Sequence, residues 1–402
     1  MDLVIGNHHL SSVGGAETYL LTIAEQLGRL GHRVTIYGSD EGDFASFLRS
    51  RRLEVAIGVD ALPGSCDAVI AQDAVSSLEL AARFPSAPQV FVSHAGHLEM
   101  WFPPNLPEVV SCVIVMNDRV GRRLEALATR HEIVRLRQPV DIGRFSPRER
   151  VRDRPRRILA LGNYLIGTRR DLLLGAAERL GIEVVQVGRH GRFTFEPEAV
   201  MRDCDIVVGH GRSLLEGMAC GLAAYVYDLC GSDGWVTPAT YQRFEADGFA
   251  GSALNDVVDT ERLVDDLARG RPQMGLDNRE LIRSNHNAID HAAELARLTR
   301  RLVPRPAGNG GAHTELARLA RSQWYAQGMA AQLRVENQVL RQELNEAKAA
   351  AQEAHSAALR AHADLEEFKR TRRYRLARLQ ARPLDALRGA VRTARARPRA
   401  GP

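Results

Sequence analysis

The sequence predicts an α/β protein with two doubly wound domains, followed by a long helical coiled coil and a basic tail. Short apolar segments alternate with helical stretches twice along the chain, with a charged break between the two series. A heptad repeat then covers residues 314–368, and Lys and Arg dominate residues 369–402. Near-continuous apolar strands between helices are typical of parallel sheets that are buried on both faces.

The first series of strands is expected to form one sheet, and the second series a smaller one. The first contains residues 3–6, 33–38, 67–71, 90–94, 112–116 and 133–136, and the second residues 158–162, 184–188, 205–209 and 224–228. The predicted organisation is a first domain at 1–147, a charged linker at 148–157, a second domain at 158–303, a Gly/Pro-containing linker at 304–313, a coiled coil at 314–368 and a basic amphipathic tail at 369–402.

Composition limits the class of protein. The chain has 402 residues, of which 45% are hydrophobic, enough for two cores and an extension. Its five cysteines are scattered and odd in number, so we expect neither a disulfide framework nor a metal site, and a reducing cytoplasm fits. The start of the sequence does not read as a signal peptide, and no apolar run reaches about 18 residues, so we expect no membrane span.

One carboxylate stands out. Glu216 lies in a short apolar helical stretch, residues 213–221, directly after a strand-like run at 204–209. At the carboxyl end of a parallel strand, where open α/β sheets bind ligands, a carboxylate is well placed to accept hydrogen bonds from sugar hydroxyls. The alternative is an ordinary acid near a helix N-terminus, stabilised by the helix dipole.

Four segments together resemble the retaining glycosyltransferases of the GT-B fold, particularly the large family 4 group. They are residues 213–221, residues 14–17 with 30–37 (GGAE followed by LGHRVTIY), residues 139–147 (PVDIGRFSP) and residues 158–162. The resemblance covers roughly residues 1–300. It implies two Rossmann-like domains, with the acceptor on the first and a nucleotide-sugar donor on the second. In that family the matching Glu, here Glu216, holds the ribose of the donor.

Transfer of a sugar from a nucleotide requires stabilisation of the charge on the leaving diphosphate. Gly14 and Gly15, which lack a Cβ, would let backbone amides approach a phosphate at the start of a helix, although a tight strand-to-helix turn also explains them. His94 stands where the family places a His near the transferred sugar, to orient it or to share developing charge. A packing role is the alternative for His94.

The chain departs from the family at its cationic clamp. Asn163 stands where an Arg is typical, so Arg169 or Arg170 would have to neutralise the diphosphate, unless both are simply solvated. A loop with Gly209, Gly211 and Arg212 offers amides and a guanidinium that could replace the missing cation. Residues 231–238 read as a rigid cleft loop facing donor or acceptor, or else as a turn with a buried Trp.

A second departure concerns an acid. The family has an acidic residue eight positions before the ribose-binding Glu, and this chain has Val208 there. The first acid of that pair supports the transferred sugar in the family. Val208 therefore puts in doubt either the identity of the sugar or the activity itself.

In the helical extension, two heptad positions hold mostly apolar residues over eight heptads. One position holds Leu316, Gln323, Ala330, Asn337, Leu344, Ala351, Ala358 and Leu365, and the other holds Leu319, Ala326, Leu333, Leu340, Ala347, Ala354, Ala361 and Phe368. This pattern predicts a coiled coil, in which Asn337 favours a parallel homodimer. A surface helix packed on its own protein is the alternative.

The tail makes the chain basic. Residues 369–402 hold twelve Lys or Arg and one acid, Asp385, whereas the whole chain has a net charge of +5. Leu376, Leu379, Leu384 and Leu387 punctuate the arginines, a pattern typical of an anchor on anionic lipid. Nucleic-acid binding and disorder are the alternatives, and we expect no nucleic acid.

The sequence thus predicts a glycosyltransferase, retaining and metal-independent, that moves a sugar from a nucleotide donor to a saccharide or lipid-linked acceptor. We expect no tightly bound cofactor, and a location at the cytoplasmic face of a membrane. A catalytically silent GT-B scaffold that oligomerises through its coiled coil is the main alternative, which Val208 and Asn163 favour. A dinucleotide oxidoreductase fits less well, because neither domain opens with GxGxxG and a following acid.

Overall fold

The structure is a computed structural model of the chain. It describes residues 1–11, 13–94, 99–147, 152–163, 165–188, 191–228, 231–256, 258–305, 310–376 and 379, apart from the side chains of residues 335, 338, 339, 342, 343 and 346. Residues 1–324 form one compact unit, and a second unit begins at Tyr325. The predicted α/β class with two sheets is confirmed.

The first sheet has seven strands in the order β3-β2-β1-β4-β5-β6-β7, and every neighbouring pair is parallel. The strands are β1 (Asp2–Gly6), β2 (Arg33–Gly38), β3 (Glu54–Ile57), β4 (Ala68–Ala71), β5 (Gln89–Ser93), β6 (Cys112–Val115) and β7 (Glu132–Arg135). Their connections contain α1 (Gly15–Arg29), α2 (Asp43–Ser50), η1 (Val59–Ala61), α3 (Ala74–Arg83), η2 (Glu99–Trp101) and α4 (Asp118–Ala126). The sequence did not predict β3, an edge strand with one buried residue, Ala56.

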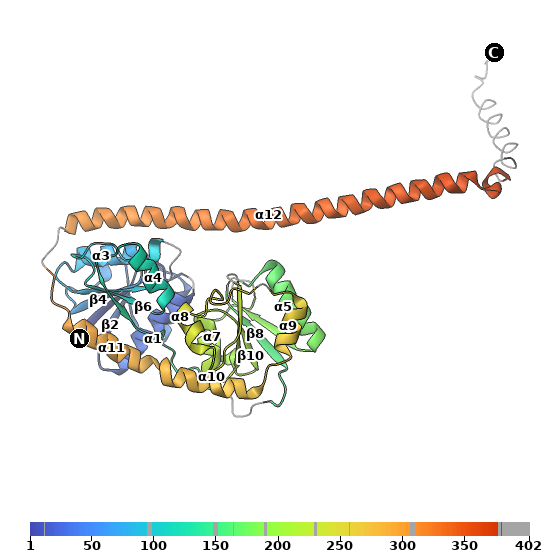
Figure 1. Cartoon of the computed structure of the whole chain (residues 1–402). Helices are drawn as coiled ribbons and strands as arrows, with labels where there is room; N and C mark the ends of the chain where they lie inside the picture. Colours follow the sequence, from blue (N-terminus) through green and yellow to red (C-terminus); the bar gives the residue numbers. More distant parts are fainter. Residues whose placement is uncertain are drawn as a thin grey trace, which may run out of the picture. The chain divides into compact units, whose positions relative to one another are not determined.

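Helices cover both faces of this sheet, which explains the apolar runs. On β1, Leu3 and Ile5 belong to one core cluster and Val4 to the cluster on the opposite face. Figure 1 shows α1 on one side of the sheet and α3 and α4 on the other. Because successive side chains of a strand point to opposite faces, a sheet covered twice needs apolar residues at every position.

The second sheet has five strands in the order β12-β11-β10-β8-β9. They are β8 (Arg157–Leu161), β9 (Glu183–Val187), β10 (Ile206–Gly209), β11 (Ala223–Asp228) and β12 (Gly231–Trp235). The helices are α5 (Gly167–Leu180), α6 (Glu198–Met201), α7 (Arg212–Ala219), α8 (Tyr241–Asp247), α9 (Thr260–Leu267) and α10 (Pro272–Asn285). This sheet is parallel apart from its edge strand β12, which pairs with β11 in the antiparallel sense.

The prediction of a cleft loop at residues 231–238 was wrong for its first part, which is β12. Backbone bonds to β11 replace the expected turn, and the Trp235 ring packs edge-on against Tyr225 at a centroid distance of 5.1 Å. The Trp235 indole Nε1 donates to the backbone oxygen of Asp266 at 2.8 Å. Trp235 therefore has a structural role on this edge strand.

Two chain segments run between the domains and are hydrogen-bonded to each other. The amide of Val140 donates to the carbonyl of His286, and the amide of Ala288 donates back to Val140. The following helix, α11 (Ala288–Arg301), packs on α1 and contributes Leu295 to the core of the first domain. After the second domain the chain therefore returns to the first domain. The sequence analysis had placed the residues of α11 in the second domain, which it assigned to 158–303.

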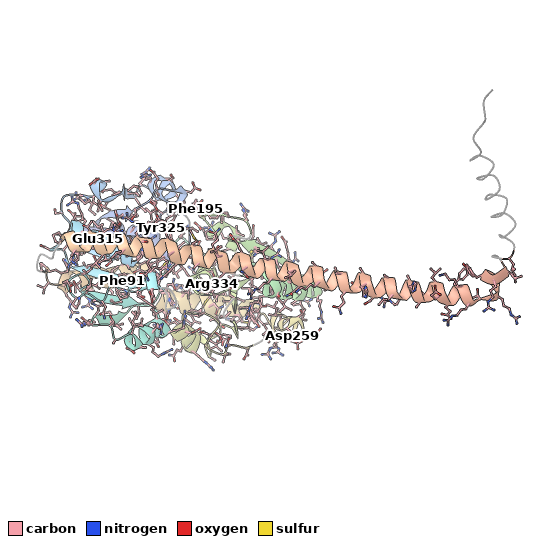
Figure 2. All side chains as sticks on the ribbon, turned by 90° about the horizontal axis from the view of Figure 1, so that it is seen from above. Phe91, Phe195, Asp259, Glu315, Tyr325 and Arg334 are labelled. Atoms are coloured by element: carbon pink, nitrogen blue, oxygen red, sulfur yellow. The ribbon has the colours of Figure 1, made fainter. Side chains whose placement is uncertain are left out.

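The longest element is α12 (Gly310–Arg370), a helix of 61 residues that Figure 1 shows as continuous. Its start packs on the first domain through buried Ala317 and through an ion pair between Arg321 and Glu79. Figure 2 labels Glu315 near the start of this helix, followed by Tyr325 and Arg334. Most of the predicted tail lies outside the described residues.

Two further findings concern the described part of the chain. Its four cysteines, Cys66, Cys112, Cys204 and Cys220, are free thiols. No helix there combines the length and the apolar character that crossing a bilayer requires.

Candidate active site between the two domains

Glycines shape the carboxyl edge of the second sheet. Gly162 and Gly188, which follow β8 and β9, have φ values of 153° and 131°, a region that L side chains rarely adopt. A Cβ on Gly209, at the end of β10, would lie 2.6 Å from the Leu161 carbonyl oxygen. The glycines therefore let three neighbouring loops approach one another, as expected for a ligand site at this edge.

A cavity of about 380 Å³ opens at this edge and reaches the first domain. From the first domain it is lined by the residues around the start of α1, and from the second by the loops after β8, β9 and β10. The lining residues are Val13, Gly14, Gly15, Thr18, Leu161, Gly162, Asn163, Val187, Gly188, Phe193, Thr194, Phe195, Pro197, His210, Arg212, Ser213 and Glu216. The structure thus brings together four predicted site residues, Gly14, Gly15, Arg212 and Glu216.

Glu216 and Arg212 form a buried ion pair in the wall of this cavity. Both lie on α7 one turn apart, and the Arg212 Nε donates to the Glu216 carboxylate at 2.7 Å. Their exposed fractions are 7% for Arg212 and 5% for Glu216. Burial raises the pKa of Glu216, and the positive charge of Arg212 opposes that rise. Arg212 therefore helps to keep Glu216 ionised inside the protein.

The same guanidinium also joins the two domains. Its other two nitrogens donate to the Pro139 carbonyl at 2.9 Å and to the Thr22 hydroxyl of α1 at 2.7 Å. The sequence predicted a diphosphate contact for Arg212 but gave no sign of these interactions. Arg212 is thus held by three partners at the cavity wall, and its contact with a diphosphate stays a prediction.

The start of α1 faces the cavity with its glycines. Gly14 is the N-cap residue and Gly15 the first residue of the helix. Space is open at Gly15, where an added Cβ would meet nothing within 4 Å. The first amides of a helix carry its positive dipole end, so this position favours an anion. Within the helix, the carboxylate of Glu17 already accepts hydrogen bonds from the amides of Gly14 and Glu17.

Two glycines of the β10–α7 loop were also predicted to bind. Gly211 caps α7 with a φ of 58° and Gly209 ends β10, next to the lining residue His210. His210 bonds through Nδ1 to the carboxylate of Asp228, which is buried at the end of β11. That carboxylate orients the imidazole at the cavity, a relation that no sequence spacing predicted.

His94 lies in the first domain, outside the residues that line the cavity. Its Nε2 is 2.6 Å from the Gln72 amide oxygen, and its ring packs edge-on against Tyr19 at 5.1 Å. Burial lowers the pKa of His94 to about 3, and the charge of Arg212 adds to that effect. A neutral imidazole can orient a sugar hydroxyl, but it cannot contribute positive charge near neutral pH.

The two arginines predicted to replace the family clamp lie in the first turn of α5. The Arg169 guanidinium lies over the Tyr227 ring at 5.9 Å, and the Arg170 Nε donates to Gln186 at 2.9 Å. Within the described part of the chain, the cavity lining includes Asn163 and Arg212 but neither of these two. Val208 is fully buried in the second core, so it offers no polar group to the cavity.

An aromatic loop after β9 was missed by the sequence analysis. Phe193 lines the cavity with 55% of its surface exposed. Phe195 stacks on Phe47 of the first domain, with ring centroids 4.8 Å apart. The only signal in the sequence was the short Phe-Thr-Phe run, which by itself does not distinguish a ligand platform from a packing contact.

Comparison with solved structures identifies the fold. The structure is similar to Anabaena HepE in complex with UDP and glucose, with a TM-score of 0.56 and 13% identity over 75% of this chain and 100% of that one. HepE in complex with UDP-glucose gives a TM-score of 0.51 at 13% identity, with the same coverage of 75% and 100%. A glycosyltransferase from Rickettsia africae ESF-5 gives 0.50 at 14% identity, covering 74% of this chain and 97% of that one.

Sequence comparisons do not identify a family. No protein-family model matches the chain, and the search of curated proteins finds no significant match. At these low identities the structural likeness concerns the fold. Two Rossmann-like domains with a cavity between them have the architecture of the GT-B fold.

Proposed function

We propose that the protein is a glycosyltransferase that moves a sugar from a nucleotide-sugar donor to a saccharide or lipid-linked acceptor. The pathway that we propose is the synthesis of cell-surface polysaccharide or glycoconjugate. The observation that carries the proposal is the buried Glu216, paired with Arg212, in the wall of a cavity that opens between two Rossmann-like domains. A buried carboxylate is costly unless it is paired, and here Arg212 pairs it at the place where a donor would bind.

The donor would use four parts of the site. Its ribose hydroxyls donate to Glu216, and its diphosphate lies against the amides at the start of α1, beside Gly14 and Gly15. The loop of Gly209 and Gly211 supplies further amides to the diphosphate. The exposed ring of Phe193 offers an apolar face to the nucleobase.

The transfer itself needs positive charge that grows in importance toward the transition state. In our proposal Arg212 supplies it from the cavity wall, and the long side chains of Arg169 or Arg170 add to it from the first turn of α5. His94, which is neutral, orients the transferred sugar. The mechanism is retaining, by resemblance to family 4, and uses no metal ion in the donor cavity and no tightly bound cofactor.

The extension would place the enzyme where its acceptor is found. The heptad seam of α12 makes a homodimer, and the basic tail binds the anionic cytoplasmic face of a membrane. Near its start α12 packs through Ala317 and Trp324, whereas the seam residues Leu316 and Leu319 are 40% and 51% exposed. The seam residue Gln323 donates to Glu99 of the first domain at 2.8 Å, so in our proposal the partner covers the seam after that residue.

A catalytically silent scaffold remains the second candidate, and the burial of Val208 favours it. The family acid at that position is replaced by a side chain that packs in the core, so a contact to the transferred sugar is lost. In a scaffold, the cavity would hold a nucleotide without transfer, or hold none.

A panel of nucleotide sugars tests the proposal. The full-length protein should release the nucleoside diphosphate from one of them, by hydrolysis or by transfer to an added saccharide. The same donor should raise the free energy of unfolding by about 2.7 kcal/mol at 100 times its dissociation constant. Stabilisation without release would support the scaffold, and neither effect across the panel would contradict the glycosyltransferase proposal.

A further inference from the structure

A second cluster of polar side chains lies in the first domain, where β1 and β2 end. The parallel ladder of these strands continues past them, because the amide of Asn7 donates to Tyr37 and the amide of Ser39 donates to His8, both at 3.0 Å. His9 then forms a parallel bridge with Asp40. The backbone thus places His8 opposite Ser39 and His9 opposite Asp40.

The residues after His9, Leu10 and Ser11, pack tightly against the end of β2 and the start of α2. A Cβ on Gly38 would lie 2.6 Å from the Leu10 side chain, and a Cβ on Gly42 would overlap the backbone of Ser11. Only glycine at both positions allows this approach. Contacts with Gly38 and Gly42 hold Leu10 and Ser11 in place. The backbone therefore fixes the positions of His8 and His9 without help from bonds within the cluster.

The cluster has a donor set suited to a metal ion. The His9 Nδ1 is 2.9 Å from the Asp40 carboxylate, and the rings of His8 and His9 have centroids 4.2 Å apart. One ligand atom from each of the three residues lies within 4.8 Å of the other two. Zinc binds imidazole nitrogen and carboxylate oxygen at about 2.0–2.2 Å, so side-chain rotations alone can close the three groups around one ion.

Hydrogen bonds behind the cluster fix which nitrogen of His8 faces an ion. The Ser39 hydroxyl donates to Glu79 at 2.9 Å and lies 2.8 Å from the His8 Nδ1. A hydroxyl has one hydrogen, which Ser39 donates to Glu79, so Ser39 must accept from the Nδ1–H of His8. The lone pair of His8 is then on Nε2. A metal-binding histidine commonly donates its other N–H in this way.

The start of α12 closes one side of the cluster. The Trp324 ring packs edge-on against His8 and His9, at centroid distances of 5.1 Å and 5.3 Å. Arg321 pairs with Glu79, which also accepts from the Tyr37 hydroxyl at 2.6 Å. The carboxylate behind the cluster is therefore held by three partners, and an aromatic wall limits water on that side.

We propose that His8, His9 and Asp40 bind a divalent transition-metal ion of the zinc class, at a site in the first domain that is separate from the donor cavity. Imidazole nitrogen favours zinc and its neighbours over magnesium. Three protein ligands leave one tetrahedral position for water or an exogenous oxygen ligand, as in zinc sites that are open to a ligand. None of the three ligands lines the donor cavity, so the inference does not depend on sugar transfer.

Metal titration of the full-length, tag-free protein tests the inference. Zinc added in competition with a chromophoric chelator should bind at one ion per chain, and magnesium should not compete. Cobalt should give the visible absorption of a four- or five-coordinate ion. Ser39→Ala, which removes the bond behind His8, should weaken zinc binding by about 10- to 100-fold.

Two variants of partly exposed ligands, His9→Ala and Asp40→Asn, should lose the site, and His355→Ala, on exposed α12, should keep it. Circular dichroism shows whether each variant is folded. Stoichiometric binding that survives in folded His9→Ala, or a wild-type protein that binds no zinc, would overturn the inference. If both ligand variants unfold, the cobalt spectrum and Ser39→Ala still decide it, since an unchanged affinity in Ser39→Ala contradicts the assignment of His8.

Discussion

Arg212 connects more of the site than any residue that the sequence singled out. It bonds Glu216 on its own helix, Thr22 of α1 and the Pro139 carbonyl between the domains. A buried pair of this kind adds little net stability relative to an apolar pair, but the loss of one partner leaves the other charge buried and unpaired. The pair therefore couples the shape of the cavity to the packing of the two domains.

Arg212→Ala should accordingly cost about 3–5 kcal/mol of unfolding free energy, because Glu216 would remain buried without its partner. Urea unfolding measures the change. Arg179→Ala is the matched control, since Arg179 pairs with Glu261 at the surface and its loss should change stability little. Equal effects of the two substitutions would show that the Arg212 pair is not buried as described.

His286 gives a pH-dependent prediction. It is buried between the Gln138 carbonyl and the Tyr241 hydroxyl, at 2.7 Å and 2.8 Å, and burial lowers its pKa to about 4. In the unfolded chain a histidine titrates near 6.5, so the unfolded chain takes up a proton first as the pH falls. The contribution of neutral His286 to the free energy of unfolding is therefore fully present above about pH 6.5. It is lost as the pH falls from 6.5 toward 4, because the unfolded chain is protonated there and the folded His286 is not.

The measurement compares wild type with His286→Gln by urea unfolding at pH 7 and at pH 5. The difference in unfolding free energy between the two proteins should be smaller at pH 5 by about 2 kcal/mol. Asp73, whose pKa burial raises to about 6, acts in the opposite direction, but it is common to both proteins and cancels. A difference that is the same at both pH values would contradict the lowered pKa.

At the scale of elements, the strands buried on both faces were predicted, as were the edge strands β7 and β9, whereas the edge strands β3 and β12 were not. Leu3, Val4 and Ile5 form a continuous apolar run because helices cover both faces of β1. β12 contains two glycines and an acid instead of an apolar run, and β3 is a short strand with a single buried residue, whereas β7 and β9 each contain adjacent β-branched residues. Glu216 was predictable from its position after a strand, whereas the Asp228 and Thr22 contacts depend on which strands and domains become neighbours.

The seam of α12 predicts the oligomeric state. Leu333 and Leu340 lie on it and are 57% and 62% exposed, an apolar stripe that a second copy would cover. Light scattering should give twice the 44.3 kDa mass of one chain for the full-length protein. A chain that ends at Trp324, which keeps the contacts of the first compact unit, should be monomeric.

Substitutions separate the seam from the rest of the helix. A double change of Leu333 and Leu340 to Glu should produce monomers, because it puts charges at two seam layers. Ala349→Glu, away from the two seam positions, should leave the dimer intact. Full-length protein that is monomeric at micromolar concentration would return α12 to the alternative of a surface helix packed on its own protein.

At the scale of the whole molecule, the chain joins a two-domain body to a charged end. Residues 369–402 hold twelve of the 54 Lys and Arg residues and a single acid. Each basic residue near an anionic membrane contributes on the order of 1 kcal/mol, screened by salt over about 10 Å at 0.1 M. Co-sedimentation should therefore show binding to phosphatidylglycerol liposomes that is weak with neutral lipid and disappears when residues 369–402 are deleted.

The apolar residues of the tail allow membrane binding to be distinguished from nucleic-acid binding by its dependence on salt. Leu376 and Leu379 are 58% and 62% exposed, and their insertion would leave part of the lipid binding resistant to salt. Binding to nucleic acid would instead fall steeply with salt through counterion release. Protein that ignores anionic liposomes but retards nucleic acid in a gel would refute the membrane proposal.

The central claim is that a nucleotide binds between the two domains through the carboxylate of Glu216. Calorimetric titration of the full-length protein with a panel of nucleoside diphosphates tests it most directly. Glu216→Gln keeps the shape and an acceptor for Arg212 but removes the charge, and it should weaken binding by about one to two orders of magnitude, since a hydrogen bond to a charged group contributes about 1.5–3 kcal/mol. Glu178→Ala, on the exposed surface of α5, should bind like wild type. Equal affinity in Glu216→Gln and wild type, or no binding across the panel, would contradict the claim.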